Sequence, residues 1–153
     1  MDFLAVRIAG KEGLETGESV IRAVASRLEK GGYVKDTYAD AVAERERSYP
    51  TGLELGGGVN VAIPHTEARH VITSAMVFAP LEREVRFGLL GDPERFVPIK
   101  MVVMLAISDP QEQVPMLRSL MRLLQNRALV ETLLASSDVD EIKRLVLSGF
   151  ETA

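Results

Sequence analysis

An uninterrupted apolar run at residues 101–107, Met-Val-Val-Met-Leu-Ala-Ile, constrains the fold of this chain more than any other part of the sequence. A strand with one face in water alternates apolar and polar side chains, whereas this run is apolar on both faces. Such a strand belongs at the centre of a sheet that helices cover on each side. The run is too short to cross a membrane as a helix, which takes about 20 residues. It predicts an α/β protein without direct membrane insertion.

The other patterns alternate between strands and helices. Strands are expected at residues 3–8, 59–63, 71–79, 85–87 and, around the apolar run, 99–107, with a turn at 11–13 after the first. One helix is expected to end at Gly31-Gly32, and a second to run from Asp36 to Pro50. Three more follow: one that begins at Pro110 or at Pro115, then 128–134 and 139–146, the last of which ends at Gly149. Because no linker or repeat divides the chain, we expect one domain over residues 1–153.

The composition excludes several classes of function. The 153 residues carry a net charge of −4, and lysine and arginine are scattered. With five Phe, three Tyr and no Trp, neither a basic stripe nor a stacking platform for nucleic acid is expected. The absence of cysteine excludes disulfides and is compatible with a reducing compartment. No signal peptide can be drawn through Arg7, Lys11 and Glu12, so we expect a cytoplasmic protein.

The tripeptide Ile63-Pro64-His65 is the main candidate for chemistry. Proline fixes φ and lacks a backbone donor, so the histidine after it is held at a strand exit, facing a loop. Imidazole is a nucleophile near neutral pH, although a lone histidine at a strand end is more often a satisfied polar residue. A metal site is not expected, because it would have to combine His65 and His70, the only two histidines, with carboxylates at an unusual spacing. The run Gly56-Gly57-Gly58 lacks the residues of a nucleotide-binding loop and is interpreted as a flexible turn.

Several motifs in order resemble a known family. They are Arg45-Glu46, Pro50-Thr51-Gly52, Ala62-Ile63-Pro64-His65, Val85-Arg86-Phe87 and the passage from Ile107 through Asp109-Pro110 to Gln113 and Leu117. Together they resemble the fructose/mannitol type of enzyme IIA of the bacterial sugar phosphotransferase system. The turn after Ile107 and the segment from His65 to His70 resemble its galactitol-specific branch more narrowly. The resemblance spans nearly the whole chain.

The resemblance implies a fold, a function and partners. The fold would be a mixed sheet of about five strands with helices on both faces, as in the mannitol-type enzyme IIA. His65 would accept a phosphoryl group on Nε2 from HPr and pass it to enzyme IIB, with the membrane component enzyme IIC acting downstream in the uptake of galactitol or a related sugar. Such a phosphohistidine carrier needs no cofactor, neither a metal nor a nucleotide.

The resemblance also proposes roles around His65. Arg45 is expected to compensate phosphoryl charge, with Arg47 as the alternative; on a helix two residues of offset turn the side chain by roughly 200°, so both cannot face the site. Thr66 is a weaker candidate, because backbone amides after His65 can bind phosphoryl oxygens. Gln113 stands where many relatives have a second active-site histidine. Its amide can donate a hydrogen bond but supplies neither charge nor proton, and it could also be a solvated residue at a helix start.

Neighbouring residues receive other expectations. His70 is expected to be a surface or partly packed residue, and Glu67 a charge that would repel phosphate. An acceptor for Nδ1–H should lie behind the His65 ring, but the sequence does not name it. Candidates for an apolar collar are Leu53, Leu55 and Val59.

Two alternative functions stay open. A regulatory protein of the same family would use phosphorylation of His65 to control a partner instead of sugar uptake. A binding module of the same fold would not be phosphorylated at all, although the retained histidine motif weighs against it.

Overall fold

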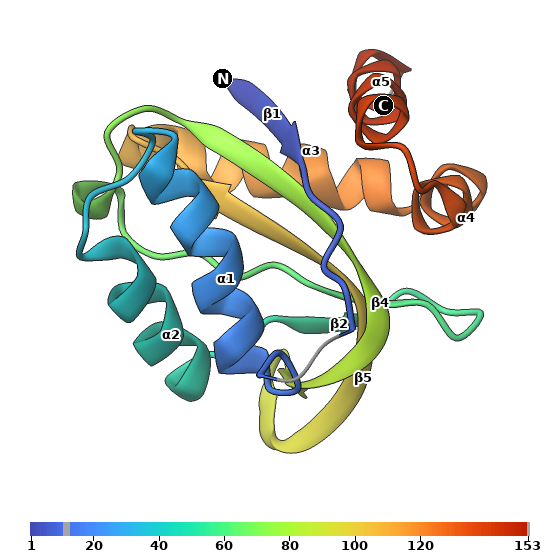
Figure 1. Cartoon of the computed structure of the whole chain (residues 1–153), viewed down its shortest axis with the longest axis horizontal. Helices are drawn as coiled ribbons and strands as arrows, with labels where there is room; N and C mark the ends of the chain where they lie inside the picture. Colours follow the sequence, from blue (N-terminus) through green and yellow to red (C-terminus); the bar gives the residue numbers. More distant parts are fainter. Residues whose placement is uncertain (11–12, 153) are drawn as a thin grey trace.

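A mixed five-stranded sheet forms the centre of the computed structural model, which describes residues 1–10 and 13–152 (Figure 1). Its long hairpin consists of β4 (Ala75–Leu89) and β5 (Asp92–Ala106), which pair antiparallel. β1 (Asp2–Ala5) runs parallel to β4, and β3 (Asn60–Ala62) runs parallel to β5. β2 (Gly52–Glu54) pairs antiparallel with β3 and also reaches β4, where Gly52 lies opposite Leu89.

The long hairpin is buried on both faces, as the apolar run predicts. Along β4, Met76 and Phe78 belong to one core and Val77 to the other, because successive side chains of a strand point to opposite faces. β5 alternates in the same way, with Val103 and Met104 in different cores. Every residue of 101–107 is buried. The prediction of a central strand covered on both sides is therefore confirmed.

Helices supply the covering layers (Figure 1). α1 (Gly17–Lys30) and α2 (Tyr38–Ser48) lie on one face of the sheet, where Val24 and Val42 join the first core. α3 (Gln113–Leu124), α4 (Arg127–Ala135) and α5 (Val139–Thr152) contribute Leu120, Leu133 and Ile142 to the second core. The mixed sheet with helices on both faces that the resemblance implied is confirmed.

Several expected boundaries differ from the structure. The strands expected at 71–79 and 85–87 are one continuous strand, β4, which begins at Ala75 and shifts register between Pro80 and Val85. The first strand ends at Ala5. Beyond it, Ile8 forms an isolated parallel bridge with Leu81 of β4. β2 was not predicted, because three residues after a proline carry too little pattern. Of the turn expected at 11–13, Lys11 and Glu12 lie outside the described residues.

The C-terminal helices also differ in detail from the prediction. A short 3₁₀ turn, Pro110–Glu112, precedes α3, so the helix begins at neither proline. Pro115 falls in the first turn of α3, where its missing N–H is not needed. α5 continues past Gly149, where a Cβ would come within 2.5 Å of Leu129 Cδ2 on α4. That glycine therefore permits close packing of the two helices and does not end α5.

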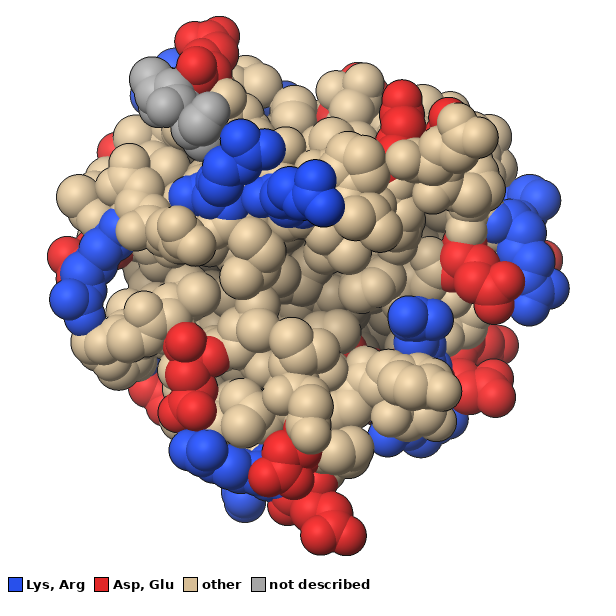
Figure 2. All heavy atoms as spheres, turned by 180° about the vertical axis from the view of Figure 1, so that it is seen from behind, with Lys and Arg blue, Asp and Glu red and all other residues tan. Residues whose placement is uncertain are grey.

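The surface carries charges of both signs. On the face shown in Figure 2, lysine and arginine side chains lie among aspartate and glutamate side chains, and the described residues form no continuous basic surface there. Within the described part of the chain, no helix combines the length and the apolar character that crossing a bilayer requires.

Candidate functional site

The strand exit at His65 is held by two hydrogen bonds, one to a side chain and one between backbone groups. The Ile63 N–H donates to Thr51 Oγ1 at 3.0 Å, and the Pro64 carbonyl accepts from the Leu105 N–H of β5 at 3.1 Å. Ile63 and Pro64 are buried, whereas His65 is partly exposed. Because β3 and β5 run parallel, their C-terminal ends meet at one edge of the sheet, and His65 follows β3 at that edge.

The His65 ring is oriented by the chain immediately before it. Its Nδ1 lies 2.8 Å from the carbonyl oxygen of Ile63. A carbonyl oxygen can only accept, so Nδ1 carries the hydrogen and Nε2 keeps its lone pair. The Ile63 carbonyl is thus the acceptor that the sequence did not name.

The surroundings of His65 favour the neutral ring. Burial is the main cause that lowers the pKa of His65 below its ordinary 6.5, and the positive charge of Arg45 lowers it further. The hydrogen bond to the Ile63 carbonyl acts in the opposite direction and raises the pKa. A neutral imidazole with a free Nε2 lone pair is the nucleophilic form.

A surface hollow of about 500 Å³, here called the His65 hollow, brings the predicted residues together. Arg45 reaches it from α2 and Gln113 from the start of α3, while His65 and Thr66 come from the loop after β3. Its remaining lining residues are Glu67, Ala68, Arg69, Pro110, Val114 and Leu117. Arg45, 20 residues before His65, and Gln113, 48 residues after it, therefore converge on one imidazole.

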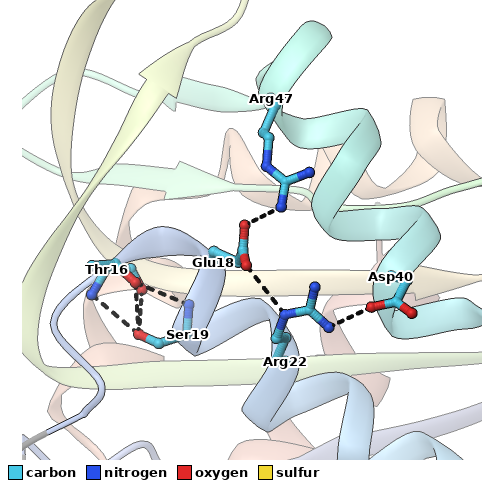
Figure 3. A network of polar contacts seen from close by, with 6 residues as sticks. All are labelled: Thr16, Glu18, Ser19, Arg22, Asp40 and Arg47. Atoms are coloured by element: carbon cyan, nitrogen blue, oxygen red, sulfur yellow. Dashed lines mark hydrogen bonds and ion pairs between the residues drawn. The ribbon is translucent and has the colours of Figure 1, made fainter.

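The two candidate arginines of α2 point to different places. Arg45 lines the His65 hollow, and its guanidinium carbon lies 5.5 Å from the centroid of the Tyr49 ring. Arg47 instead binds Glu18 of α1 at 2.5 Å, as Figure 3 shows. Glu18 also pairs with Arg22, which in turn contacts Asp40 of α2 at 2.7 Å. The structure favours Arg45 at the site and gives Arg47 a role between the two helices.

The apolar wall of the hollow differs from the expected collar. Leu53, Leu55 and Val59 do not line the His65 hollow. Leu55 and Val59, in the connection between β2 and β3, pack toward the second core and border a separate hollow of about 280 Å³ beside α3 and α4. The apolar residues near His65 are Val114, which is 60% exposed, and Leu117 of α3. That part of the prediction is wrong.

His70 is packed away from the His65 hollow. It is 9% exposed, and its Nδ1 lies 2.8 Å from Thr37 Oγ1 at the start of α2. Burial and the neighbouring charge of Arg69 lower its pKa. Glu67 is exposed and pairs with Arg69 at 3.4 Å. His70 is therefore a packed residue that connects the 3₁₀ turn Ala68–His70 to α2.

Sequence reasoning missed the contact between Glu46 and Thr51. The Glu46 carboxylate accepts the Thr51 N–H at 2.7 Å and the Thr51 hydroxyl at 2.8 Å. Burial raises the pKa of Glu46 to about 7, against the effect of these two hydrogen bonds. Both residues belong to the quoted motifs, so their presence was visible, but nothing in the sequence indicated that they contact each other.

No cluster of three or more metal-binding side chains occurs among residues 1–10 and 13–152. The polar groups at the site are an imidazole, two guanidinium groups, an amide, a hydroxyl and a carboxylate. Such a set suits recognition of a phosphoryl group by hydrogen bonds and positive charge.

Comparison with known proteins identifies the family. Residues 4–149 match the model of the phosphoenolpyruvate-dependent sugar phosphotransferase system, EIIA 2. The chain belongs to this EIIA family. It is 34% identical over 115 residues to the galactitol-specific EIIA component of Escherichia coli K12, which covers 75% of each protein. It is also 32% identical over 134 residues to the mannitol-specific EIICBA component of the same strain, covering 86% of this chain and 20% of that protein.

A solved structure supports the same assignment. Enzyme IIA for mannitol from Escherichia coli, in complex with phosphorylated enzyme IIB, matches with a TM-score of 0.73 and 28% identity over 93% of this chain and 94% of that one. EIIA components are phosphotransferase proteins that carry phosphohistidine. This EIIA chain is accordingly a phosphotransferase component.

Proposed function

We propose that His65 is the phosphohistidine of this EIIA protein, accepting the phosphoryl group from HPr and passing it to an enzyme IIB. The single observation that carries the proposal is the Nδ1–H bond to the Ile63 carbonyl, which leaves Nε2 free to attack. The mannitol enzyme IIA forms a complex with phosphorylated enzyme IIB, which supports the choice of recipient. Galactitol or a related polyol is the proposed transported sugar, because the 34% identical relative is galactitol-specific.

In this protein, the His65 ring is the group that forms a covalent bond to phosphorus. The Nε2 lone pair forms a bond to phosphorus as the bond between phosphorus and the donor atom breaks, and the electron pair of that bond stays on the donor. The His65 ring then carries a positive charge, which the Ile63 carbonyl stabilises through Nδ1–H. In the second step a nucleophile of enzyme IIB forms a bond to phosphorus as the bond between Nε2 and phosphorus breaks, and the electron pair of that bond returns to Nε2.

The other residues of the His65 hollow assist charge and geometry. Arg45 compensates negative charge on the phosphoryl oxygens, and its position over the Tyr49 ring limits its freedom. Gln113 donates an amide hydrogen to the same oxygens, and Thr66 offers a further donor. With an amide in place of a second histidine, this site relies on hydrogen bonds and the arginine for charge compensation.

Reconstitution with phosphoenolpyruvate, enzyme I, HPr and a galactitol-type enzyme IIB tests the proposal. Wild-type protein should acquire an acid-labile label and lose it to enzyme IIB, whereas His65→Gln should fold and stay unlabelled. Undiminished labelling of His65→Gln would refute the assignment of His65. Label that forms on wild type but never moves to enzyme IIB would instead favour the regulatory alternative.

A further inference from the structure

Hydrogen bonds connect the partly buried carboxylate of Glu46 with Ile63, and Ile63 with the His65 ring. Glu46 is adjacent in sequence to Arg45 but lies on another side of α2, where it borders a small hollow next to Phe87 and Gly88 of β4. From there its two oxygens hold Thr51, one through the backbone N–H and one through the hydroxyl. Thr51 in turn accepts the Ile63 N–H, and the Ile63 carbonyl accepts His65 Nδ1–H.

The carboxylate of Glu46 sets the direction of the Thr51 hydroxyl hydrogen. Above its raised pKa of about 7 the Glu46 carboxylate is ionised and only accepts, so the Thr51 hydroxyl hydrogen then points toward it. The lone pairs of Thr51 Oγ1 are then available to the Ile63 N–H, which lies 3.0 Å away. The Thr51 side chain is thereby fixed by Glu46 on one side and holds the Ile63 N–H on the other.

From this geometry we infer that Glu46 and Thr51 are positioning residues which hold Ile63, and through it select the His65 tautomer that has a free Nε2 lone pair. The inference rests on the proposed function of His65 for its catalytic consequence. Neither Glu46 nor Thr51 lines the His65 hollow, so neither touches the phosphoryl group.

The selection matters because the two neutral tautomers of imidazole have opposite reactivity at Nε2. The tautomer with hydrogen on Nε2 has no lone pair there and cannot attack phosphorus. Among the described residues, the Ile63 carbonyl is the hydrogen-bond partner that favours Nδ1–H, and its position depends on how Ile63 is anchored. Ile63 is anchored by the Thr51 hydroxyl at its N–H and by packing of its side chain in the second core.

Two substitutions at Thr51 separate positioning from packing. Thr51→Val keeps the shape but removes the hydroxyl, so both Glu46 and the Ile63 N–H lose a partner. Thr51→Ser keeps the hydroxyl and loses only a methyl group. Glu46→Gln is a third variant, because the two Thr51 donors bind different carboxylate oxygens and an amide offers only one acceptor oxygen. Thermal unfolding of each variant reports whether it folds.

The first measurement is the tautomer of His65 from imidazole ¹⁵N chemical shifts of the unphosphorylated protein above pH 7. Wild type and Thr51→Ser should show the Nδ1–H form, and Thr51→Val and Glu46→Gln a mixture with Nε2–H. The second is the rate of phosphoryl acceptance from phosphorylated HPr. It should fall roughly tenfold or more in Thr51→Val, because misplacement of a reacting group is costly, and recover in Thr51→Ser.

The two measurements distinguish failure of the positioning role from failure of the proposed function. Folded Thr51→Val and Glu46→Gln that keep the pure Nδ1–H tautomer would overturn the positioning role, whatever the rates. If the tautomer changes as expected but wild type takes no label from phosphorylated HPr, the proposed function fails while the positioning of the ring stands.

Discussion

His65 Nδ1 lies 2.8 Å from the carbonyl oxygen of Ile63, a residue only two positions earlier in the chain. The intervening proline fixes φ and lacks a backbone N–H, which allows the chain to turn the ring back onto that carbonyl. The ring is therefore oriented by the strand exit itself, and no distant side chain has to supply the acceptor. Burial and Arg45 keep the pKa of this histidine below 6.5, so the nucleophilic form persists at neutral pH.

Arg45 and Arg47 form a matched pair for testing charge compensation. Arg45→Ala should slow phosphoryl acceptance by about 100-fold, as loss of one charge-stabilising donor does at other sites. Arg47→Ala should leave the rate within about twofold of wild type, because Arg47 faces Glu18 at a distance from the hollow. Rates of labelling by phosphorylated HPr decide between them. Equal losses in both variants would contradict the assignment of Arg45.

The sequence predicts the core of this fold because its signal is local. A run that is apolar on both faces at residues 101–107 requires a covered central strand, and the periodicity of α1 requires a partner surface. β2 could not be predicted, since its three residues form a strand only because β3 pairs with them. The two strands expected at 71–79 and 85–87 likewise form one strand, β4, because β5 pairs with it on both sides of the register shift between Pro80 and Val85.

The candidate site was predictable as a set of residues, but its contacts were not. The quoted motifs include His65, Arg45 and Gln113, and all three line one hollow. The expected collar failed because Leu55 and Val59 lie in the connection between β2 and β3 and pack toward the second core, an orientation that depends on how these strands pair. The hydrogen bonds between Glu46 and Thr51 join α2 to the residue just before β2. The spacing of the two residues in the sequence does not reveal that they are in contact.

Gln113 tests what an amide contributes in place of a second histidine. Gln113→Ala should slow phosphoryl acceptance by about tenfold, since it removes one hydrogen bond to a charged oxygen. Gln113→His should transfer faster as pH falls below about 6.5, where an imidazolium adds charge and a proton. A pH series of labelling rates for the three proteins measures both effects. A Gln113→Ala rate equal to wild type would make Gln113 a solvated helix-start residue.

The raised pKa of Glu46 predicts a pH dependence of stability. Its pKa is about 7 in the folded chain against 4.5 when exposed, so the folded state binds more protons between these values. The Glu46 contribution to the free energy of unfolding therefore falls as pH rises from about 4.5 to 7, by up to about 3 kcal/mol, and is constant above. Urea unfolding of wild type and Glu46→Gln across this range should show their difference changing by that amount. A difference independent of pH would mean that the carboxyl titrates normally.

Gly52 holds β2 against β4 where the motif Pro50-Thr51-Gly52 enters the sheet. A Cβ at this position would lie 2.5 Å from the carbonyl oxygen of Gly88, a backbone atom that cannot rotate away. Gly52→Ala should therefore lower the free energy of unfolding by about 1 to 3 kcal/mol, the usual cost of forcing an extra carbon into a packed site. Gly149→Ala is the control, because its Cβ also comes within 2.5 Å of an atom, but that atom is the mobile tip of Leu129. Urea unfolding should show the larger loss for Gly52→Ala, and the reverse order would mean that the strand accommodates the methyl group by moving.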